Sequence, residues 1–246
     1  MESLKLEIEY LEWDSRFFNL KIGRILLNNI NLHNNFEEVL FQINDYDLIY
    51  IFSLTQIPVI SHVNLKLVDV KRTYKLDLAN FKLGKISNDF TNNINVYDKT
   101  YVIPELEDLA YKTGEYSRFK TDSYFDTSSF KGLYKTWIEN SVKKINCDEI
   151  FVYSINDRIV GFVTVKFDKN SCRIGLIGVD ENYRGMQVGS NLIKKVINEA
   201  LLRNITSIYV DTQKDNHIAC RFYEKNGFKI HLEQYIYHYW RIYDKL

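Results

Sequence analysis

The stretch from Cys172 to Gly189 has the composition expected of an anion-binding turn. An apolar run, Cys172–Val179, precedes the polar sequence D-E-N-Y-R-G-M-Q-V-G at positions 180–189, and a helical pattern follows. In such a strand–loop–helix unit, successive backbone N–H groups and the positive end of the helix dipole face one spot. Gly185 and Gly189 lack Cβ, so the backbone there can approach a pyrophosphate closely.

The loop differs from two other phosphate-binding loops. It lacks the Gly-Lys-Ser/Thr ending of a Walker P-loop and the three glycines of the dinucleotide fingerprint. An ordinary strand-to-helix turn with a capping glycine explains a lone Arg-Gly pair about as well. A second motif downstream favours the anion site. It reads N-x-x-A-x-x-F-Y-E-x-x-G-F, with Asn216, Ala219, Phe222, Tyr223, Glu224, Gly227 and Phe228 in its fixed places.

Together the two motifs resemble those of the GNAT superfamily of acyl-CoA-dependent N-acyltransferases. The first is similar to that family's R/Q-x-x-G-x-G/A loop, with Arg184, Gln187 and Gly189 in the signature places. Gln187 stands where the family usually has glycine, and its side chain either crowds the pyrophosphate or points outward. The resemblance runs from about Tyr116 to the C-terminus.

The resemblance implies a binding mode for CoA. The backbone amides that would hold its pyrophosphate are those of Arg184, Gly185, Met186, Gln187, Val188, Gly189 and Ser190. The strand ending at Val179 would splay from the strand Ile205–Val210, and pantetheine would fill the gap by pairing with the backbone of Ile177 and Val179. The cosubstrate would be acetyl-CoA or another short acyl-CoA such as 3-hydroxybutyryl-CoA.

Tyr223 is the expected catalytic residue, because the family often has its tyrosine in this F-Y-E-x-x-G-F context. When an amine attacks the thioester, CoA leaves as a thiolate, and a Tyr hydroxyl can protonate the sulfur. The alternative is that Tyr223 packs on the sheet. Asn216 is expected to cap the following helix, to contact pantetheine, or to do both.

The sequence does not rank the groups that could remove a proton from the attacking amine. The candidates on nearby loops are Glu181, Asp211, Asp215 and His217. Each is equally well explained as a solvated surface residue, and a water chain or an already neutral amine would need no dedicated base. The base is left unassigned.

A narrower resemblance concerns the acceptor. The sequences W-D-S-R-F-F at 13–18 and I-G-R at 22–24 resemble the opening of bacterial GNAT enzymes that N-acylate dTDP-linked amino sugars. The run with Ser117, Arg118, Phe119, Asp122, Tyr134, Trp137 and Ile138 is also similar to that group. The implied acceptor is a nucleotide-linked amino sugar, for bacterial surface glycans such as O-antigen.

Such an acceptor needs a cation beside its diphosphate and an aromatic ring beside thymine. Arg16, Arg24 and Arg118 are the candidates for the first role, and Trp13 and Phe17 for the second. An exposed or structural ion pair is an equal alternative for each arginine. Trp residues are mostly found in cores, so packing is the alternative for Trp13.

The second half of the chain carries clear periodicities. Helical spacing predicts helices over about 128–144, 189–202 and 218–225, the last closed by Gly227. Strands are predicted at Ile150–Ser154, Ile159–Lys166, Cys172–Val179, Ile205–Val210, Phe228–His231 and Tyr235–Ile242. The Asn156-Asp157-Arg158 turn predicts a hairpin between the first two strands.

The first half predicts strands at Leu4–Leu11, Leu48–Phe52 and Lys66–Leu78, with a helix marked by Phe36, Val39, Leu40 and Ile43. A polar, Asn-rich stretch ends near Asn95. We therefore expect two domains. Residues 1–95 form a smaller α/β domain that contributes to the acceptor pocket, and residues 96–246 form the catalytic GNAT domain with a mixed, mostly antiparallel sheet and flanking helices.

The composition narrows the class of protein. Among 246 residues, 32 Lys and Arg balance 32 Asp and Glu, so the chain has no electrostatic footprint for nucleic acid or an anionic membrane. Charges in the first ten residues exclude a signal peptide, and no apolar run could span a bilayer. Three cysteines without metal-ligand spacing predict neither disulfides nor a metal site. We expect a cytoplasmic enzyme, with a homodimer as one option.

Two rival functions stay open. One is a GNAT enzyme that acts on a protein N-terminus, a lysine or a small amine. The other is a non-catalytic acyl-CoA-binding module. The W-D-S and S-R-F runs argue against the first, and the retained Tyr223 argues against the second.

Overall fold

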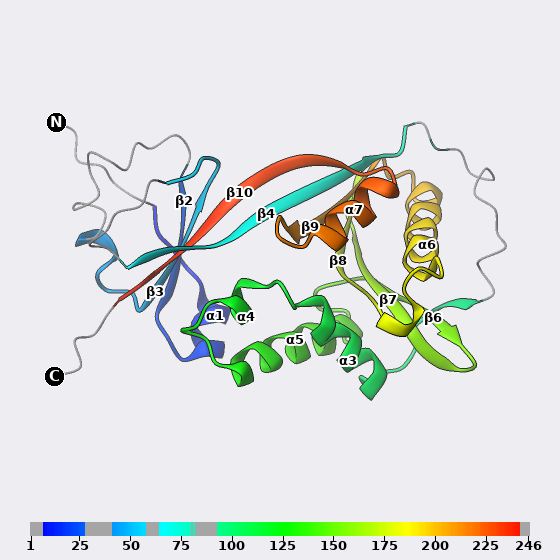
Figure 1. Cartoon of the computed structure of the whole chain (residues 1–246), viewed down its shortest axis with the longest axis horizontal. Coiled ribbons are helices and arrows are strands. Elements are labelled where there is room, and N and C mark those ends of the chain that lie inside the picture. Colours follow the sequence, from blue (N-terminus) through cyan, green and yellow to red (C-terminus); the bar gives the residue numbers. More distant parts are fainter. Residues whose placement is uncertain (1–6, 28–40, 58–63, 80, 82–92, 242–246) are drawn as a thin grey trace. The chain divides into compact units, whose positions relative to one another are not determined.

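The computed structural model describes residues 7–27, 41–57, 64–79, 81 and 93–241, and its elements are shown in Figure 1. Contacts divide the chain into two compact units, residues 1–71 with 233–246 and residues 72–232. The expected boundary near Asn95 lies inside the second of these units. The difference arises because two long strands, β4 (Leu65–Asp77) and β10 (Lys229–Trp240), each begin in one unit and end in the other.

The second unit is built on a sheet with the strand order β4-β9-β8-β7-β6-β5. Its further strands are β5 (Ile94–Val96), β6 (Glu149–Ile155), β7 (Arg158–Phe167), β8 (Ser171–Val179) and β9 (Ser207–Gln213). Antiparallel pairing joins β5 to β6, β6 to β7 and β7 to β8, whereas β8 and β9 are parallel. Asn156 and Asp157 have φ angles of 48° and 61° in the tight β6–β7 turn. The predicted hairpin is therefore confirmed.

Helices cover both faces of this sheet. They are α3 (Pro104–Thr113), α4 (Arg118–Thr121), α5 (Thr127–Val142), α6 (Val188–Leu202) and α7 (His217–Lys225). On β7, Phe162 packs with α3 and α5, whereas its neighbour Val163 packs with α6. Because side chains alternate along a strand, α3 and α5 lie on one face and α6 on the other, as Figure 1 shows.

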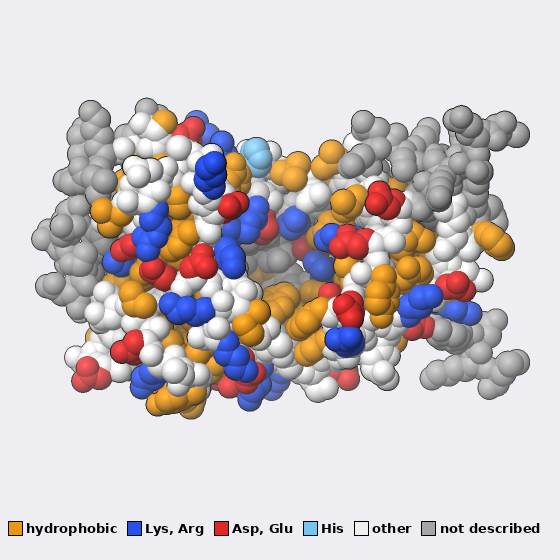
Figure 2. Space-filling view, turned by 180° about the vertical axis from the view of Figure 1, so that it is seen from behind, with side chains coloured by type: hydrophobic (Ala, Val, Ile, Leu, Met, Phe, Trp, Pro, Cys, Tyr) orange, Lys and Arg blue, Asp and Glu red, His pale blue; other side chains and the backbone are white. Residues whose placement is uncertain are grey.

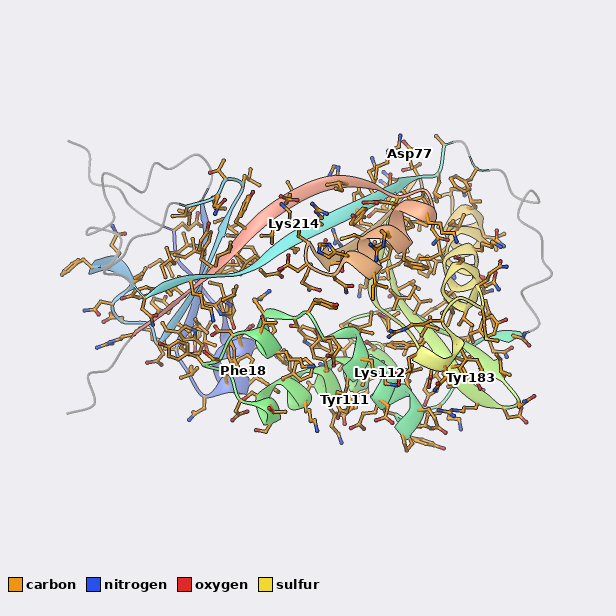
Figure 3. The ribbon with its side chains drawn as sticks, viewed as in Figure 1. Phe18, Asp77, Tyr111, Lys112, Tyr183 and Lys214 are labelled. Carbon is orange, nitrogen blue, oxygen red and sulfur yellow. The ribbon has the colours of Figure 1, made fainter. Side chains whose placement is uncertain are left out.

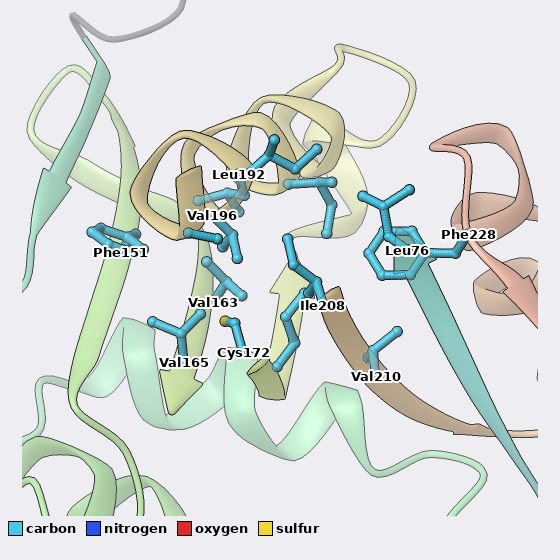
Figure 4. Packing of buried hydrophobic residues seen from close by; sticks show 14 of the residues in the cluster. Leu76, Phe151, Val163, Val165, Cys172, Leu192, Val196, Ile208, Val210 and Phe228 are labelled. Atoms are coloured by element: carbon cyan, nitrogen blue, oxygen red, sulfur yellow. The ribbon is translucent and has the colours of Figure 1, made fainter. Parts of the chain in front are cut away.

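The larger core lies beneath α6 and is drawn in Figure 4. Val163 and Val165 of β7 meet Leu192 and Val196 of α6 there, and Ile208 of β9 closes the group. All five side chains are buried. Burying a Val, Leu or Ile side chain contributes about 1.5–3 kcal/mol. This core fixes the start of α6 against the ends of β7 and β8.

Several elements of the second half differ from the sequence-based expectation, and the short helix α4 and the strand β5 were not predicted. The predicted strands Phe228–His231 and Tyr235–Ile242 form one continuous strand, β10, because the polar residues between them stay extended. Helix α3 was not predicted, although Pro104 at its first turn and the acidic Glu105 and Glu107 are typical helix-start signals. The other predicted helices and strands of this half are present within a few residues of their expected bounds.

The first unit has its own mixed sheet. Its described elements are β1 (Glu9–Tyr10), α1 (Glu12–Phe18), β2 (Ile22–Leu27) and β3 (Leu48–Ser53), with the strand order β1-β2-β3-β10. Only β2 and β3 are parallel among these pairs. Residues 1–6 and most of the expected helix at 36–43 lie outside the described residues. The W-D-S-R-F-F run forms α1.

Both units thus carry mixed sheets in which antiparallel pairs predominate, and the predicted fold class is confirmed. Basic and acidic side chains are interspersed on the face seen in Figure 2, in keeping with the balanced composition. No helix of the described residues is long and apolar enough to cross a membrane. All three cysteines are buried and unpaired.

Candidate active site

Strands β8 and β9 separate part-way along their length. They pair from Ser171 opposite Ser207 to Ile174 opposite Val210, and the described residues show no pairing beyond that point. Both strands nevertheless continue, β8 to Val179 and β9 to Gln213. The far part of β8 therefore has a partner, β7, on one edge and none on the other.

A β-bulge accompanies this separation. The register of β7 with β8 shifts between Val163 and Val165, so Gly175 and Leu176 of β8 share one partner, Thr164. The Leu176 N–H donates to Thr164 Oγ1 at 2.8 Å. A Cβ on Gly175 would approach that same oxygen to 2.8 Å. Bulges bend the strand that carries them, and this one lies where β8 leaves β9.

Backbone direction assigns the open edge of β8. The N–H groups of Leu176 and Asp180 both donate toward β7, to Thr164 Oγ1 and to the Val160 carbonyl. Backbone groups of alternate residues face opposite edges of a strand. Those of Ile177 and Val179 therefore face the gap, the two residues expected to pair with pantetheine.

The turn after β8 is held from within. Asp180 caps the short 3₁₀ helix Glu181–Tyr183, its carboxylate accepts the Asn182 N–H at 3.0 Å, and this bond lowers the pKa of Asp180. Glu181 lies 3.8 Å from the ammonium of Lys112 on α3, and Figure 3 labels Lys112 and Tyr183 beside this turn. The turn therefore has a defined position between α3 and α6.

The start of α6 carries a cluster of N–H groups. The first bond of the helix runs from the Asn191 N–H to the Gln187 carbonyl at 2.9 Å. Within the described chain, no acceptor takes the N–H groups of Gly185, Gln187, Val188, Gly189 and Ser190. Arg184, Gly185, Met186 and Gln187 are exposed beside them. N–H groups that have no acceptor and lie at the positive end of a helix dipole are suited to bind an anion such as a pyrophosphate.

The two glycines of this loop have different structural roles. Gly185 has a φ of +81° and open space where a Cβ would lie. A Cβ on Gly189 would instead meet the Phe222 ring of α7 at 3.0 Å. Gly189 therefore allows α6 and α7 to pack closely, which is a structural requirement beside the expected approach of pyrophosphate.

Gln187 occupies a left-handed position, with a φ of 62°. The usual family glycine suits this backbone, because a side chain in the left-handed region costs about 1–2 kcal/mol. We expect Gln187→Gly to raise the free energy of unfolding by about 1 kcal/mol over Gln187→Ala, which keeps the Cβ. Urea unfolding of the two variants measures this difference. Equal stability would show that the loop bears no strain at Gln187.

Asn216 and Tyr223 belong to α7. The Asn216 side chain accepts the Ala219 N–H at 3.1 Å, so it caps this helix. Tyr223 is 4% exposed and packs in the core beneath α6 and α7, with ring contacts to Tyr74, Phe222 and Phe228. The described residues give its hydroxyl no hydrogen-bond partner.

Burial raises the pKa of Tyr223, and the negative charge of Asp211 adds to this shift. The phenol therefore stays protonated at neutral pH, as a proton donor must. Beside it, the Tyr74 hydroxyl donates to Glu224 Oε1 at 2.9 Å. Sequence reasoning missed Tyr74, because the contact joins β4 to α7, which is 150 residues away in the sequence.

The four base candidates are now distinguishable by their surroundings. Asp211 is the one whose charge contributes to the raised pKa of Tyr223. Its carboxylate accepts the Thr73 hydroxyl at 2.5 Å and Arg173 Nη1 at 2.9 Å. Glu181 belongs to the turn after β8, and Asp215 and His217 are exposed at the start of α7.

The candidate acceptor residues of the first unit have local partners. Arg16 Nη2 lies 2.6 Å from Glu12 Oε1 on α1, and Arg24 Nε lies 3.0 Å from Glu9 Oε2 across β1 and β2. Trp13 is 42% exposed and therefore is not a core residue. Its ring stacks on Phe17 with centroids 5.1 Å apart.

The S-R-F run begins α4 in the second unit. Ser117 caps the helix, and the Arg118 guanidinium lies over the Phe119 ring at 4.5 Å. Phe119 in turn contacts Phe125 and Trp137 edge-on. Part of the sequence run therefore builds an aromatic cluster between α4 and α5.

A comparison with protein families settles the class of this domain. Residues 113–228 match the acetyltransferase (GNAT) family. The chain contains a GNAT acetyltransferase domain. The predicted resemblance is thus confirmed over residues 113–228. The matched residues include the splayed strands, the start of α6 and Tyr223.

Curated relatives match parts of this chain. The uncharacterized protein YxbD of Bacillus subtilis is 35% identical over 35% of this chain and 54% of its own length. The spore coat polysaccharide biosynthesis protein SpsD of B. subtilis is 23% identical over 54% of this chain and 46% of its own. The dTDP-fucosamine acetyltransferase of Escherichia coli O6:H1 is 28% identical over 54% of this chain and 57% of its own length. The chain spans about half the length of these relatives.

A solved structure extends the likeness in fold. A functionally unknown conserved protein from Staphylococcus epidermidis has a TM-score of 0.60 with this chain, at 13% identity, over 98% of this chain and 94% of its own length. At this identity, the likeness concerns the fold alone.

Proposed function

We propose that the protein transfers an acyl group from acetyl-CoA, or another short acyl-CoA, to an amine. Two adjoining features carry this proposal. One edge of β8 has no strand partner beyond Ile174, and the turn that follows β8 ends in the N–H groups without an acceptor at the start of α6. In the proposed mode, amides of residues 184–190 bind the pyrophosphate, and Ile177 and Val179 pair with pantetheine. Asn216 contacts pantetheine while its side chain caps α7.

The proposed reaction is a direct transfer. The amine nitrogen attacks the thioester carbonyl carbon, a C–N bond forms, and the C–S bond breaks. The sulfur leaves as a thiolate and takes the proton of the Tyr223 hydroxyl. The nitrogen gives its extra proton to water, and the Tyr223 phenolate regains a proton from solvent. Burial raises the pKa of the Tyr223 phenol, so its proton is in place before the thiolate forms, and a positioned donor eases expulsion of the sulfur.

For the acceptor we propose a dTDP-linked amino-dideoxy sugar of a bacterial surface glycan. The W-D-S-R-F-F and S-R-F runs support this choice, as do the names of two relatives, a dTDP-fucosamine acetyltransferase and a spore coat polysaccharide biosynthesis protein. Trp13, Arg16 and Arg24 would then serve acceptor binding together with Arg118. The alternative acceptor is a protein N-terminus, a lysine or a small amine.

A rate screen tests the choice of acceptor. dTDP- and UDP-linked amino sugars, free amino sugars, peptides and simple amines are each supplied with acetyl-CoA or 3-hydroxybutyryl-CoA, and the released thiol is measured. We expect the highest kcat/KM with a dTDP-amino sugar. Acylation of a peptide or simple amine, with no nucleotide-linked sugar used, would assign the protein to the alternative class.

Arginine variants test the acceptor residues separately. We expect at least one of Arg16→Ala, Arg24→Ala and Arg118→Ala to raise KM for the sugar nucleotide severalfold, because a guanidinium pairs strongly with phosphate. KM for acyl-CoA should stay near the wild-type value, which excludes general destabilisation. Glu12→Gln and Glu9→Gln are matched controls that break the ion pairs of Arg16 and Arg24 while keeping both guanidiniums. Three alanine variants with unchanged KM would contradict the assignment.

A further inference from the structure

A group of polar side chains lies on one face of the sheet in the second unit. On this part of the sheet, Tyr74, Cys172, Ile174, Ile208 and Val210 point into the core beneath α6 and α7. Because side chains alternate along a strand, the residues between them face the opposite side. These are Thr73, Lys75, Arg173, Tyr209 and Asp211, and the ring of His231 joins them; we call this group the β4–β9 surface.

The ring of Tyr209 is the centre of this surface. The Lys75 ammonium lies 5.8 Å from the ring centroid, and the Arg173 guanidinium lies 5.7 Å from it. The His231 ring contacts Tyr209 edge-on at 5.5 Å. Two cations thus lie within 5.8 Å of the centroid of one aromatic ring, where each is attracted by the negative charge of a ring face.

Arg173 is fixed in place but keeps unused donors. Its Nη1 bonds to Asp211 Oδ2 at 2.9 Å, and the other Asp211 oxygen accepts from Thr73. A guanidinium has five N–H donors, so one bond leaves several for a ligand. The Arg173 side chain is 53% exposed. Lys75 has no carboxylate within salt-bridge distance among the described residues.

The β4–β9 surface begins where the strands separate. Arg173 precedes Ile174, and Asp211 follows Val210, the last residues that pair β8 with β9. Figure 3 labels Lys214, directly after β9, and Asp77 at the end of β4, which mark the ends of these two strands. The surface therefore adjoins the gap in which the acyl group would lie, on the face away from α6.

We propose that the β4–β9 surface contributes two further cations, Lys75 and Arg173, to binding the diphosphate of a nucleotide-linked acceptor. This inference rests on the proposed function, because it places the acceptor beside the splayed strands. Arginine can bind two phosphate oxygens in a fork, and lysine acts as a point charge on a phosphate. The Tyr209 hydroxyl and the His231 ring supply further polar groups beside the two cations.

The test compares Lys75→Gln with Lys131→Gln, which removes a lysine from the exposed side of α5. We expect Lys75→Gln to raise KM for a dTDP-amino sugar about tenfold, the scale of one charged hydrogen bond. KM for acyl-CoA, and for the same amino sugar without the nucleotide, should not change. Lys131→Gln should leave all three values at the wild-type level.

A binding measurement tests the β4–β9 surface independently of which acceptor the protein acylates. Calorimetry of dTDP against protein saturated with CoA should show binding that Lys75→Gln and Arg173→Gln each weaken about tenfold, while thymidine binds weakly to all. This readout holds even if the protein acylates no nucleotide-linked sugar. Unchanged dTDP affinity and unchanged KM in both folded variants would overturn the proposal while leaving the acyltransferase reaction intact.

Discussion

Phenylalanine in place of Tyr223 is expected to lower kcat by about 10²-fold or more. The loss follows because the departing thiolate would have no proton donor, whereas the ring itself would stay packed against Tyr74, Phe222 and Phe228. Affinity for acyl-CoA should stay close to that of wild type, since the hydroxyl acts only as the C–S bond breaks. Steady-state kinetics and calorimetry measure the two effects separately.

Tyr74→Phe is the matched control for this experiment. It removes a neighbouring hydroxyl that donates to Glu224, so it alters the surroundings of Tyr223 without removing the proposed acid. Its effect on kcat should be much smaller than that of Tyr223→Phe. If Tyr223→Phe keeps nearly full kcat, with chemistry shown to be rate-limiting, Tyr223 has a packing role only.

Valine in place of Gly189 is expected to weaken CoA binding by about 1–3 kcal/mol, the scale of local strain and unmade hydrogen bonds. A Cβ at this position already meets Phe222 at 3.0 Å, so the larger side chain must push the start of α6 away from α7. The N–H groups that follow Gln187 would then lose their alignment. Calorimetry with CoA gives the change in affinity.

Gly189→Ala provides the graded comparison, since its single methyl needs a shift of a few tenths of an ångström in the Phe222 ring. We expect its affinity for CoA to lie between those of wild type and Gly189→Val. Thermal unfolding establishes that each variant is folded before binding is compared. A folded Gly189→Val protein with wild-type affinity would place the pyrophosphate elsewhere.

Much of the GNAT domain could be predicted because its signals are local. The apolar spacing of α5 and α6, the Asn156-Asp157 turn and the Gly227 helix end each depend on neighbouring residues only. The two motifs likewise lie within short stretches. They therefore predict the loop at 184–190 and Tyr223 as candidate site residues from the sequence alone.

The features that escaped prediction depend on contacts between distant parts of the chain. The residues that neighbour Thr164 in the sequence do not indicate that its hydroxyl accepts the Leu176 N–H at the bulge of β8. The second half of β10, from Tyr235 to Trp240, pairs with β3, which is far away in sequence. The partners of Arg16 and Arg24 are glutamates that many other surface positions could have supplied.

A crystal structure of the protein with acetyl-CoA bound tests the central claim most directly. The pyrophosphate is expected to accept hydrogen bonds of about 2.7–3.2 Å from the N–H groups between Gly185 and Ser190. Pantetheine should pair with the backbone of Ile177 and Val179, and the sulfur should lie beside the Tyr223 hydroxyl. Acetyl-CoA bound away from the β8–β9 gap, or with its sulfur remote from Tyr223, would contradict the account.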